Sequence, residues 1–549
     1  MRITSIPQLY RHVNRWREIL SILSKYGLAD WLSRFDIPLA RGLLKNRDGE
    51  VLSRLSREAR IRLALEELGP TFIKLGQILS TRPDQVGIEL ATELSKLQCD
   101  VPADSAELIE QTIESELGRP AEELFATFEM QPVASASIGQ VHRATLHTGE
   151  AVAVKVQHAN IQSRVRIDLD ILKGLALLAE RLPELQPYRP QAMAAEFQRM
   201  LRRELDFSRE QRHLSQFARN FAGDRRIHVP RCHPELSTAR VLTLEWLDGI
   251  KLCDSALPQN GQLDRATIAR NGADLYLEMI FRHGLYHADP HPGNLLLMPH
   301  DTIGLLDFGM VGRLDATLQE EIEDMLMAIV AKDAQQLTNL VMRLGAIPPG
   351  LDEPLLSADL TDFVDHYGNQ PMDEFDLAGA LTEFIEITRR YHIVLPGSLA
   401  MLLKVLVMLE GTAKRLQPNF SLMELIEPYR KGMVARRMSP IRQTKKLLRI
   451  YGEMEQLAEI LPRRLRDILS QVQSGKFDVH LDHRGLEPSV NRLVWGMLTS
   501  ALILGSTLLL SHNVWPVRGV SLPGAIGIVL SGLLGLRLMW AINKSGHLD

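Results

Sequence analysis

Two long apolar runs near the end of the chain constrain its fold more than any other feature. Residues 493–511 and 520–542 are largely apolar, and each is about long enough to cross a hydrocarbon layer of ~30 Å as a helix. Two buried core helices are the alternative, but the runs are adjacent, C-terminal and almost uncharged. We therefore predict a transmembrane α-hairpin over residues 491–544.

Basic residues are distributed unevenly around these runs. Residues 431–490 are rich in Lys and Arg, whereas the loop between the two runs offers only Arg518. Because Lys and Arg are retained on the cytoplasmic side, this bias predicts that the body of the chain and its C-terminus lie in the cytoplasm. The basic juxtamembrane region is interpreted as a solvated helical face or as a surface attracted to anionic lipid.

Length and composition limit the class of protein. The 549 residues exceed the usual size of a single core, which predicts two or more structural units. The net charge of −4 gives no reason to expect a nucleic-acid partner. Cys99, Cys232 and Cys253 form no CxxC motif, which suits a reducing compartment. No signal peptide is expected, and residues 1–46 are predicted to form amphipathic helices that lie on a membrane or pack on the main domain.

A second constraint lies in the middle of the chain, in the stretch His287-Ala-Asp-Pro-His-Pro-Gly-Asn294 and the following Leu306-Asp-Phe-Gly309. Phosphoryl transfer needs one carboxylate that orients or deprotonates a nucleophile, and an amide and a second carboxylate that hold Mg²⁺ against the phosphates. The spacing has the order of a kinase catalytic loop followed by its DFG segment. It predicts Asp289 as the catalytic residue and Asn294 and Asp307 as metal ligands.

Upstream residues supply the expected phosphate-binding parts. Two β-prone runs meet at Thr148-Gly149, and Lys155 lies in the second of them, where a kinase carries the lysine that contacts the α- and β-phosphates. The preceding loop keeps one glycine, Gly139, so we expect a stiffer loop than the usual glycine-rich one. A helix predicted over residues 191–217 offers carboxylates for Lys155. Asp206 and Glu210 would share one of its faces, where two like charges are costly without a cation.

Two departures argue against an ordinary protein kinase. Ala288 replaces the arginine of the H-R-D motif, so activation by a phosphorylated loop is not expected. No A-P-E segment follows Gly309, so the platform for a protein substrate is not evident. A β-rich part followed by a helical part with the catalytic loop nevertheless predicts an α+β, bilobal protein-kinase-like fold with a helical N-terminal extension and a C-terminal transmembrane α-hairpin.

These motifs together resemble the UbiB family of atypical kinase-like proteins, linked to ubiquinone (coenzyme Q) biosynthesis. The resemblance covers roughly residues 56–310 and includes Lys74-Leu-Gly-Gln77, the alanine-rich loop and Glu204-Leu-Asp206. It implies ATP and Mg²⁺ as cofactors, Glu210 as the partner of Lys155, and Lys74 and Gln77 on an extension that covers the site and faces Glu204 and Asp206. The nucleotide-binding residues that it implies are Val133, Ala134, Ser135, Ala136, Ser137, Ile138, Gly139, Gln140, Val141, Lys155 and Glu210.

The resemblance also implies an arrangement of domains and a place in the cell. We expect an N-terminal extension at residues 1–125, a kinase-like N-lobe at 126–249, a helical C-lobe at 250–430, a basic region at 431–490 and the hairpin. The expected location is the bacterial inner membrane, with the kinase-like body in the cytoplasm.

Three functions stay open at this point. The first is an ATPase that supports ubiquinone biosynthesis by giving access to polyprenyl intermediates. The second is a phosphotransferase that acts on a protein or small molecule, because the catalytic loop also resembles those of aminoglycoside and choline kinases. The third is a nucleotide-sensing scaffold for other ubiquinone-biosynthesis proteins. Gly527, Ser531 and Gly535 form a small-residue face that predicts hairpin packing or a homodimer.

Overall fold

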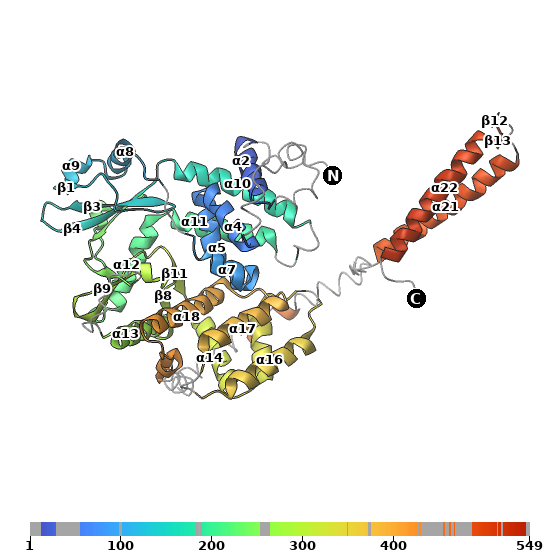
Figure 1. The fold of residues 1–549 in the computed structure, drawn as a ribbon. Coiled ribbons are helices and arrows are strands. Elements are labelled where there is room, and N and C mark those ends of the chain that lie inside the picture. The colour runs from blue at the N-terminus through green and yellow to red at the C-terminus, as the bar shows by residue number, and fades with distance from the viewer. Residues whose placement is uncertain are drawn as a thin grey trace. The chain divides into compact units, whose positions relative to one another are not determined.

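Figure 1 shows the fold in a computed structural model of the chain. The structure describes residues 13–28, 55–97, 102–181, 186, 189–252, 264–348, 350–371, 375–426, 428–429, 454–455, 460–462, 466, 486–512, 514–517 and 520–544. The chain divides into two compact units, Met1–Ser439 and Pro440–Asp549. Most of the basic region predicted at 431–490, together with Cys99 and Cys253, lies outside the described residues. The finer domain boundaries stay predictions.

Among the described residues, five helices precede the N-lobe. Ser56 caps α4 by accepting a hydrogen bond from the Ala59 N–H, and Gly69, with φ 94°, separates α4 from α5. The apolar face of α2 is buried at Trp16, Ile19 and Leu20, in one cluster with residues of α4, α5 and α10. This confirms packing on the main domain for the described part of the N-terminal segment. The helices are α2 (Val13–Lys25), α4 (Arg57–Leu68), α5 (Pro70–Ser80), α6 (Pro83–Val86) and α7 (Ile88–Leu94).

The N-lobe is built on a five-stranded antiparallel sheet of order β1-β3-β4-β6, with β2 added to β3. The predicted hairpin is confirmed, and Gly149 turns it with φ 86°. Helix α8 covers one face of the sheet, where Ile109 and Ile113 are buried against Val152, Val154 and Val156. The elements are α8 (Ala106–Leu117), α9 (Ala121–Leu124), β1 (Thr127–Phe128), β2 (Ala134–Ser135), β3 (Gly139–Thr145), β4 (Ala151–Gln157) and β6 (Val241–Glu245).

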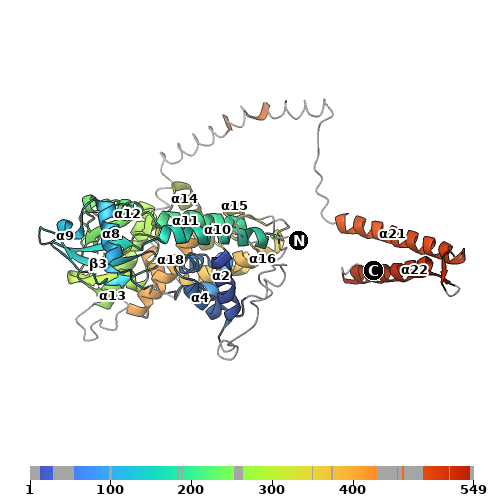
Figure 2. The same ribbon diagram turned by 90° about the horizontal axis from the view of Figure 1, so that it is seen from above.

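Three helices connect β4 to the rest of the lobe: α10 (Ile161–Ala179), α11 (Pro190–Glu204) and α12 (Phe207–Asn220). Helices α10 and α11 run side by side (Figure 2). The prediction of a single helix over residues 191–217 is wrong, because the helix is interrupted between α11 and α12. Asp206 is the N-cap of α12, with φ −115°, and accepts from the Ser208 N–H. It therefore does not share a helical face with Glu210, and the like-charge argument made for this pair fails.

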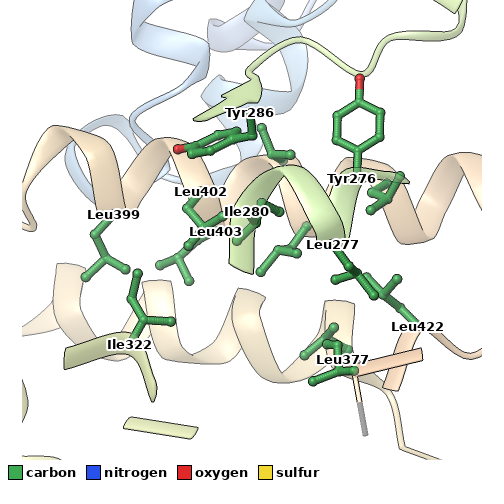
Figure 3. Packing of buried hydrophobic residues seen from close by; sticks show 14 of the residues in the cluster. Tyr276, Leu277, Ile280, Tyr286, Ile322, Leu377, Leu399, Leu402, Leu403 and Leu422 are labelled. Atoms are coloured by element: carbon green, nitrogen blue, oxygen red, sulfur yellow. The ribbon is translucent and has the colours of Figure 1, made fainter. Parts of the chain in front are cut away.

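The C-lobe combines short strands with long helices, although only helices and the catalytic loop were predicted there. One sheet has the order β5-β10-β9-β7, and β8 pairs with β11 around the catalytic loop. Tyr286 and Leu277 lie in one large buried cluster with Leu399 and Leu402 of α18 (Figure 3). The strands are β5 (Ile227–His228), β7 (Ile250–Lys251), β8 (Leu285–His287), β9 (Leu295–Met298), β10 (Thr302–Leu305) and β11 (Val311–Arg313). The helices are α13 (Arg265–Glu278), α14 (Ala316–Val330), α15 (Ala334–Leu344), α16 (Glu353–Gly368), α17 (Leu377–Arg390) and α18 (Gly397–Leu416), with a π-helical turn at Met279–His283.

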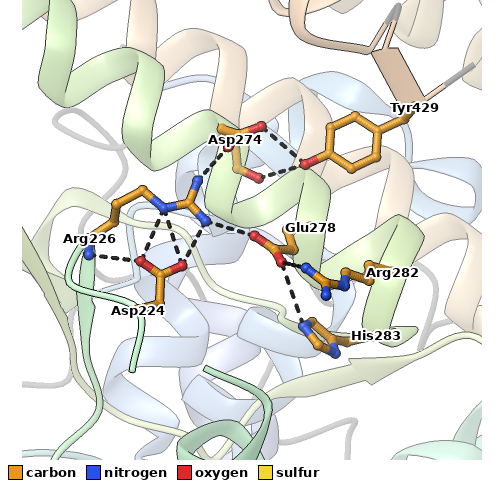
Figure 4. A network of polar contacts seen from close by, with 7 residues as sticks. All are labelled: Asp224, Arg226, Asp274, Glu278, Arg282, His283 and Tyr429. Carbon is orange, nitrogen blue, oxygen red and sulfur yellow. Dashed lines mark hydrogen bonds and ion pairs between the residues drawn. The ribbon is translucent and has the colours of Figure 1, made fainter. Parts of the chain in front are cut away.

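Arg226 ties the start of β5 to α13 (Figure 4). Its guanidinium contacts Asp224 at 2.6 Å, Asp274 at 2.5 Å and Glu278 at 2.7 Å. Tyr429 donates to the Oδ1 atom of Asp274 at 3.0 Å. These hydrogen bonds raise the pKa of Arg226, which therefore stays charged. The network fixes the C-lobe sheet against the helix that leads into the catalytic loop.

The second unit is a helical hairpin of α21 (Leu486–Ser511) and α22 (Leu522–Lys544), joined through β12 (Pro516–Val517) and β13 (Val520–Ser521). Its outer faces are apolar, whereas Thr499, Ser506 and Ser531 are buried between the helices. Residues Leu493–Ser511 and Leu522–Met539 are long and apolar enough to cross a membrane, and little of either run is buried. Apolar surfaces outside and small polar groups inside suit a lipid environment, which favours membrane association.

The small-residue face lies inside this hairpin. A Cβ atom at Gly527 would meet Ser506 Oγ, and one at Gly535 would lie 3.9 Å from Thr499 Cγ2. Ser531 is 2% exposed. This face therefore packs α21 against α22 within one chain, which confirms the predicted hairpin packing. The homodimer remains untested.

Candidate active site

The catalytic loop follows β8 and includes a 3₁₀ turn at Pro292–Asn294. Within it, Asn294 Nδ2 donates to Asp289 Oδ2 at 2.7 Å and to the Asp289 carbonyl at 3.3 Å. The loop therefore brings the predicted catalytic carboxylate and the predicted amide ligand together. Asp289 is partly exposed, so its carboxylate is accessible to a small acceptor group.

His287 connects the catalytic loop to the DFG segment. The side chain is fully buried, and its Nε2 contacts the carbonyls of Leu306 at 2.9 Å and Asp307 at 3.0 Å. The Asp289 N–H donates to Nδ1 at 3.3 Å. Carbonyls accept only and an amide N–H donates only, so these contacts fix the neutral tautomer with the proton on Nε2. His287 therefore holds the DFG segment against the catalytic loop.

The DFG segment is held by helix α12. Phe308 is fully buried, its N–H donates to Glu210 Oε1 at 3.1 Å, and its carbonyl accepts from His213 Nδ1 at 3.0 Å. Asp307 has φ 53°, a left-handed conformation that Asp tolerates better than most residues. The Gly309 N–H donates to Asp307 Oδ1 at 3.2 Å and stabilises this turn. The two contacts from α12 fix the backbone next to Asp307.

Lys155 lies between two carboxylates. Its Nζ contacts Glu210 Oε2 at 2.9 Å and Asp307 Oδ1 at 3.3 Å, and it lies 5.1 Å from the centre of the Phe207 ring. Burial acts to lower the pKa of Lys155, but the charges of Asp307 and Glu210 raise it above its usual value. The charge of Lys155 holds the pKa of Asp307 well below its usual range. This geometry brings the predicted lysine, helix glutamate and DFG aspartate into one cluster.

The Lys74 segment lies beside this cluster. Lys74, on α5, forms an ion pair with Glu204 at the end of α11, with a distance of 2.5 Å. Its charge reaches Asp307 and contributes to lowering the pKa of that carboxyl. Gln77 donates to the Leu97 carbonyl at 3.3 Å, while Asp206 caps α12.

The glycine of this motif has a packing role. A Cβ atom at Gly76 would lie 2.2 Å from Leu97 Cδ1 and 3.0 Å from Leu65 Cδ1. The close approach of α5 to α7 and α4 therefore needs a glycine here.

The alanine-rich loop is a tight turn between β2 and β3. The Ala136 N–H donates to the Gly139 carbonyl at 2.8 Å. A Cβ atom at Gly139 would lie 2.4 Å from the Val156 carbonyl oxygen, so this glycine is required by the packing of β3 on β4. Val133 is exposed, Ile138 and Ser137 are buried, and Ser135 Oγ is buried without a hydrogen-bond partner. The nucleotide contacts expected for residues 133–141 stay predictions.

Gln140 has a structural position within that loop. Its side chain is fully buried, with Oε1 accepting from the Asp104 N–H at 2.8 Å and Nε2 at 2.9 Å from His142 Nε2. His142 Nδ1 in turn donates to the Glu129 carbonyl at 2.8 Å. The side chain of Gln140 is thus occupied by the fold, and its backbone lies in β3, in register with Ser135 of β2 and Val156 of β4.

The donor groups of the site fit a magnesium–nucleotide complex. Asp307 and Asn294 offer a carboxylate and an amide oxygen, and Mg²⁺ is typically held by one or two carboxylates together with phosphate oxygens. Among the described residues, no group of three or more His, Cys, Asp or Glu side chains forms a metal site by itself. The unpartnered Ser135 hydroxyl is a further donor in the loop expected to cover the phosphates.

Two functional contacts had only weak signals in the sequence. His213 lies three residues after Glu210, on the face of α12 that holds the DFG backbone. The three-residue spacing between Glu210 and His213 could have indicated a shared helical face only after Glu210 had been assigned to the site. The structural role of His287 depends on hydrogen bonds to the carbonyls of Leu306 and Asp307, which lie about twenty residues away in sequence.

Comparisons with known proteins identify related sequences along most of the chain. Residues 96–341 match the ABC1 atypical kinase-like domain, residues 360–421 the UbiB helical domain, and residues 480–544 the ABC1/UbiB kinase-like C-terminal domain. The chain is 34% identical to a probable protein kinase UbiB of Xylella fastidiosa, over 87% of this chain and 88% of that protein. It is 31% identical to the uncharacterized protein sll1770 of Synechocystis sp., over 97% of this chain and 91% of that protein.

A solved structure was also found. It is the complex of Rv3197 with erythromycin from Mycobacterium tuberculosis, 26% identical, covering 69% of this chain and 97% of that one with a TM-score of 0.48. The family matches and the Xylella relative, together with the kinase-like site described above, establish that the chain belongs to the ABC1/UbiB family of atypical kinase-like proteins.

Proposed function

We propose that this chain binds Mg-ATP, hydrolyses it and thereby supports ubiquinone biosynthesis at the cytoplasmic face of the bacterial inner membrane. The observation that carries the proposal is the cluster of Lys155, Glu210 and Asp307 next to the pair Asp289 and Asn294. Membership of the UbiB family supports the link to ubiquinone. The two apolar helices support a place of action at a membrane, where polyprenyl precursors are found.

The proposed mechanism assigns one task to each residue. Lys155, held by Glu210, neutralises the inner phosphates. Asn294 and Asp307 would hold the metal ion, which would supply neutralisation of the charge that develops on the phosphates. Asp289 orients the attacking water or hydroxyl group. Lys74 is paired with Glu204 and its charge acts on Asp307, which supports a role for the N-terminal extension in keeping an extended protein substrate away from the site. Hydrolysis then drives access to polyprenyl lipids, alone or with other ubiquinone-biosynthesis proteins.

The test is the turnover of ATP by the purified full-length protein, with and without anionic liposomes and a compound that resembles a polyprenylphenol headgroup. We expect Mg²⁺-dependent hydrolysis that Asp307→Asn lowers at least a hundredfold. In cells that lack the protein, Asp307→Asn should fail to restore ubiquinone. Absence of hydrolysis, together with full restoration by Asp307→Asn, contradicts the proposal. Full restoration by Asp289→Ala would favour a scaffold instead.

A phosphotransferase is the second candidate, because Asp289 is partly exposed and positioned by Asn294 as for an acceptor hydroxyl. It predicts transfer of radiolabelled phosphate from ATP to a polyprenylphenol or to a partner protein. Robust hydrolysis without such transfer eliminates it.

A further inference from the structure

His158 follows directly after β4, three residues beyond Lys155, and contacts the alanine-rich loop. Its side chain is buried, and its Nε2 atom lies 2.9 Å from the Ala136 carbonyl oxygen. A carbonyl only accepts, so Nε2 carries a proton and donates it. The backbone N–H of His158 donates to the Ile138 carbonyl at 3.0 Å. One residue therefore holds two carbonyls, one on each side of Ser137 at the tip of the loop.

These two contacts set how the loop presents its backbone. In a planar trans peptide unit the C=O and N–H bonds point in opposite directions. The carbonyls of Ala136 and Ile138 turn toward His158. The N–H groups of the residues that follow them, Ser137 and Gly139, therefore point away from it. Backbone N–H groups are what an anion-binding loop offers to a phosphate, so His158 determines the direction in which two such groups point.

Asp104, in the segment before α8, holds His158 and the other arm of the loop. Its Oδ2 atom accepts from the Ala159 N–H at 2.8 Å and lies 3.2 Å from His158 Nδ1. Its own backbone N–H donates to Gln140 Oε1 at 2.8 Å, where the loop enters β3. Asp104 thus connects both arms of the loop to the chain segment that precedes the N-lobe sheet.

The surroundings of His158 favour its charged form. Nε2 faces a carbonyl and Nδ1 faces the Asp104 carboxylate, and both groups are acceptors. The Nδ1 atom is buried and has no aligned hydrogen bond, so its contact with Asp104 is one between opposite charges. A neutral ring with its proton on Nε2 would instead turn a lone pair toward the carboxylate. The imidazolium form therefore fits both contacts.

A loop of this composition depends on such support. A glycine-rich loop can turn its peptide units freely, because glycine adopts positive φ without strain. Residues 134–138 of this chain all carry a Cβ atom, and Gly139 is packed against the Val156 carbonyl. The loop therefore has few alternative conformations, and the contacts of His158 select one of them.

We propose that His158, held by Asp104, is a positioning residue for the nucleotide site, and that it fixes the alanine-rich loop in the conformation that receives the phosphates shared by ATP and ADP. This inference rests on the nucleotide binding in the proposed function. Without His158 the loop has to be ordered during binding, which weakens the affinity. The residues assigned to the reaction, Asp289, Asn294 and Asp307, lie outside the loop. The change is therefore expected in KM and not in kcat.

The test compares His158→Phe with His158→Gln in the full-length protein. Equilibrium dialysis with radiolabelled Mg-ATP and Mg-ADP gives the two affinities, and Mg-ATP hydrolysis gives kcat and KM. We expect His158→Phe to weaken both nucleotides at least tenfold and to change kcat less than twofold. Glutamine keeps an N–H donor in the place of Nε2, so His158→Gln should stay within threefold of the wild-type affinities.

His147 offers a matched control in the same lobe. It is exposed in the turn between β3 and β4, and its Nε2 atom lies 3.1 Å from the Glu123 carbonyl oxygen. His147→Phe removes the same kind of contact at a place outside the alanine-rich loop. Both affinities and kcat should stay at their wild-type values in this variant.

The outcomes separate this inference from the proposed function. Wild-type affinities in His158→Phe, or equal weakening in His158→Phe and His158→Gln, overturn the role of His158 while the nucleotide site stands. A loss of kcat as large as the loss of affinity overturns it as well. Binding without hydrolysis in the wild type overturns the proposed function alone, and the affinities still decide the role of His158. A wild-type protein that binds no nucleotide overturns both.

A second variant covers the case in which His158→Phe does not fold. Asp104→Ala removes the carboxylate beside Nδ1 and the acceptor for the Ala159 N–H. We expect it to weaken Mg-ATP and Mg-ADP at least threefold with kcat unchanged. Wild-type affinities in Asp104→Ala would then overturn the inference.

Discussion

Glu210→Gln tests the central cluster with the smallest possible change of shape. Glu210 Oε1 accepts from the Phe308 N–H at 3.1 Å, and Oε2 accepts from Lys155 Nζ at 2.9 Å. Glutamine offers one acceptor oxygen and one NH₂ group. Whichever way the amide turns, an N–H group faces a donor, so one of the two contacts is lost.

The cost follows from which contact is lost. A buried hydrogen bond to a charged group is worth about 1.5–3 kcal/mol, and an unpaired buried donor costs a similar amount. Lys155 keeps Asp307 at 3.3 Å, which places the expected loss at about 2 kcal/mol. In a large domain, each kcal/mol of lost stability lowers the melting temperature by about 2 °C, so we expect a decrease of about 4 °C.

The assay is urea and thermal unfolding of the full-length protein without nucleotide, with Glu122→Gln on an exposed position of α9 as the control. ATP turnover is expected to fall at least tenfold as well, because either Lys155 or the backbone next to Asp307 loses its contact with residue 210. Stability equal to that of the wild type would refute the reasoning. Burial raises the pKa of Glu210, and a protonated glutamic acid, like glutamine, has one carbonyl oxygen that accepts and one group that donates. Such a result would mean that Glu210 is neutral and that Asp307 alone balances Lys155.

Three further predictions concern other parts of the chain. Gly139→Ala places a Cβ atom 2.4 Å from the Val156 carbonyl oxygen, about 1 Å closer than an ordinary contact, and should destabilise the N-lobe by about 3 kcal/mol in urea unfolding. Gly411→Ala is the control, because Gly411 has no positive φ and a Cβ atom there would meet nothing within 4 Å. Burial lowers the pKa of His142 in the folded state, so its contribution to stability is full above the usual histidine pKa of ~6.5. Below that pH the unfolded chain binds a proton at this histidine and the stability falls. The melting temperature should therefore drop between pH 7.5 and pH 5.5, and less so in His142→Gln. Ser531→Leu should force α21 and α22 apart and reduce disulfide formation between cysteines placed at Thr499 and Gly535; an altered oligomer size in detergent with unchanged disulfide formation would instead favour the homodimer.

Much of the site could be predicted from sequence because its signals are local. The hairpin turn at Gly149 needs a positive φ, and the strand that follows it carries Lys155 four residues into β4. The spacing of Asp289 and Asn294 is set by one short loop. Each of these features depends on residues within about ten positions of one another, so the pattern survives without knowledge of the tertiary structure.

The errors arose where tertiary contacts decide. The break between α11 and α12 was missed because apolar residues continue across it, although Asp206 followed by Phe207 and Ser208 is a recognisable N-cap pattern. The hydrogen bond between Lys404 of α18 and Ser80 of α5 could not be predicted, because it joins positions more than three hundred residues apart. The strands of the C-lobe are two to four residues long, too short for a period of two to be distinguished from a buried turn.

The charges around Asp307 connect the docking of α5 to the state of the site. Lys155 contacts Asp307 at 3.3 Å, and the charge of Lys74 reaches the same carboxyl, so two ammonium groups stabilise its ionised form. A carboxylate that already has two cationic neighbours gains less from a metal ion than one that has none. Docking of α5 through Lys74 and Glu204 therefore opposes metal binding at Asp307 to some degree, and movement of Lys74 away from it favours metal binding. On this argument, the extension that covers the site weakens the binding of the metal and of the nucleotide that accompanies it, so any ligand or surface that displaces α5 should raise the affinity for Mg-ATP.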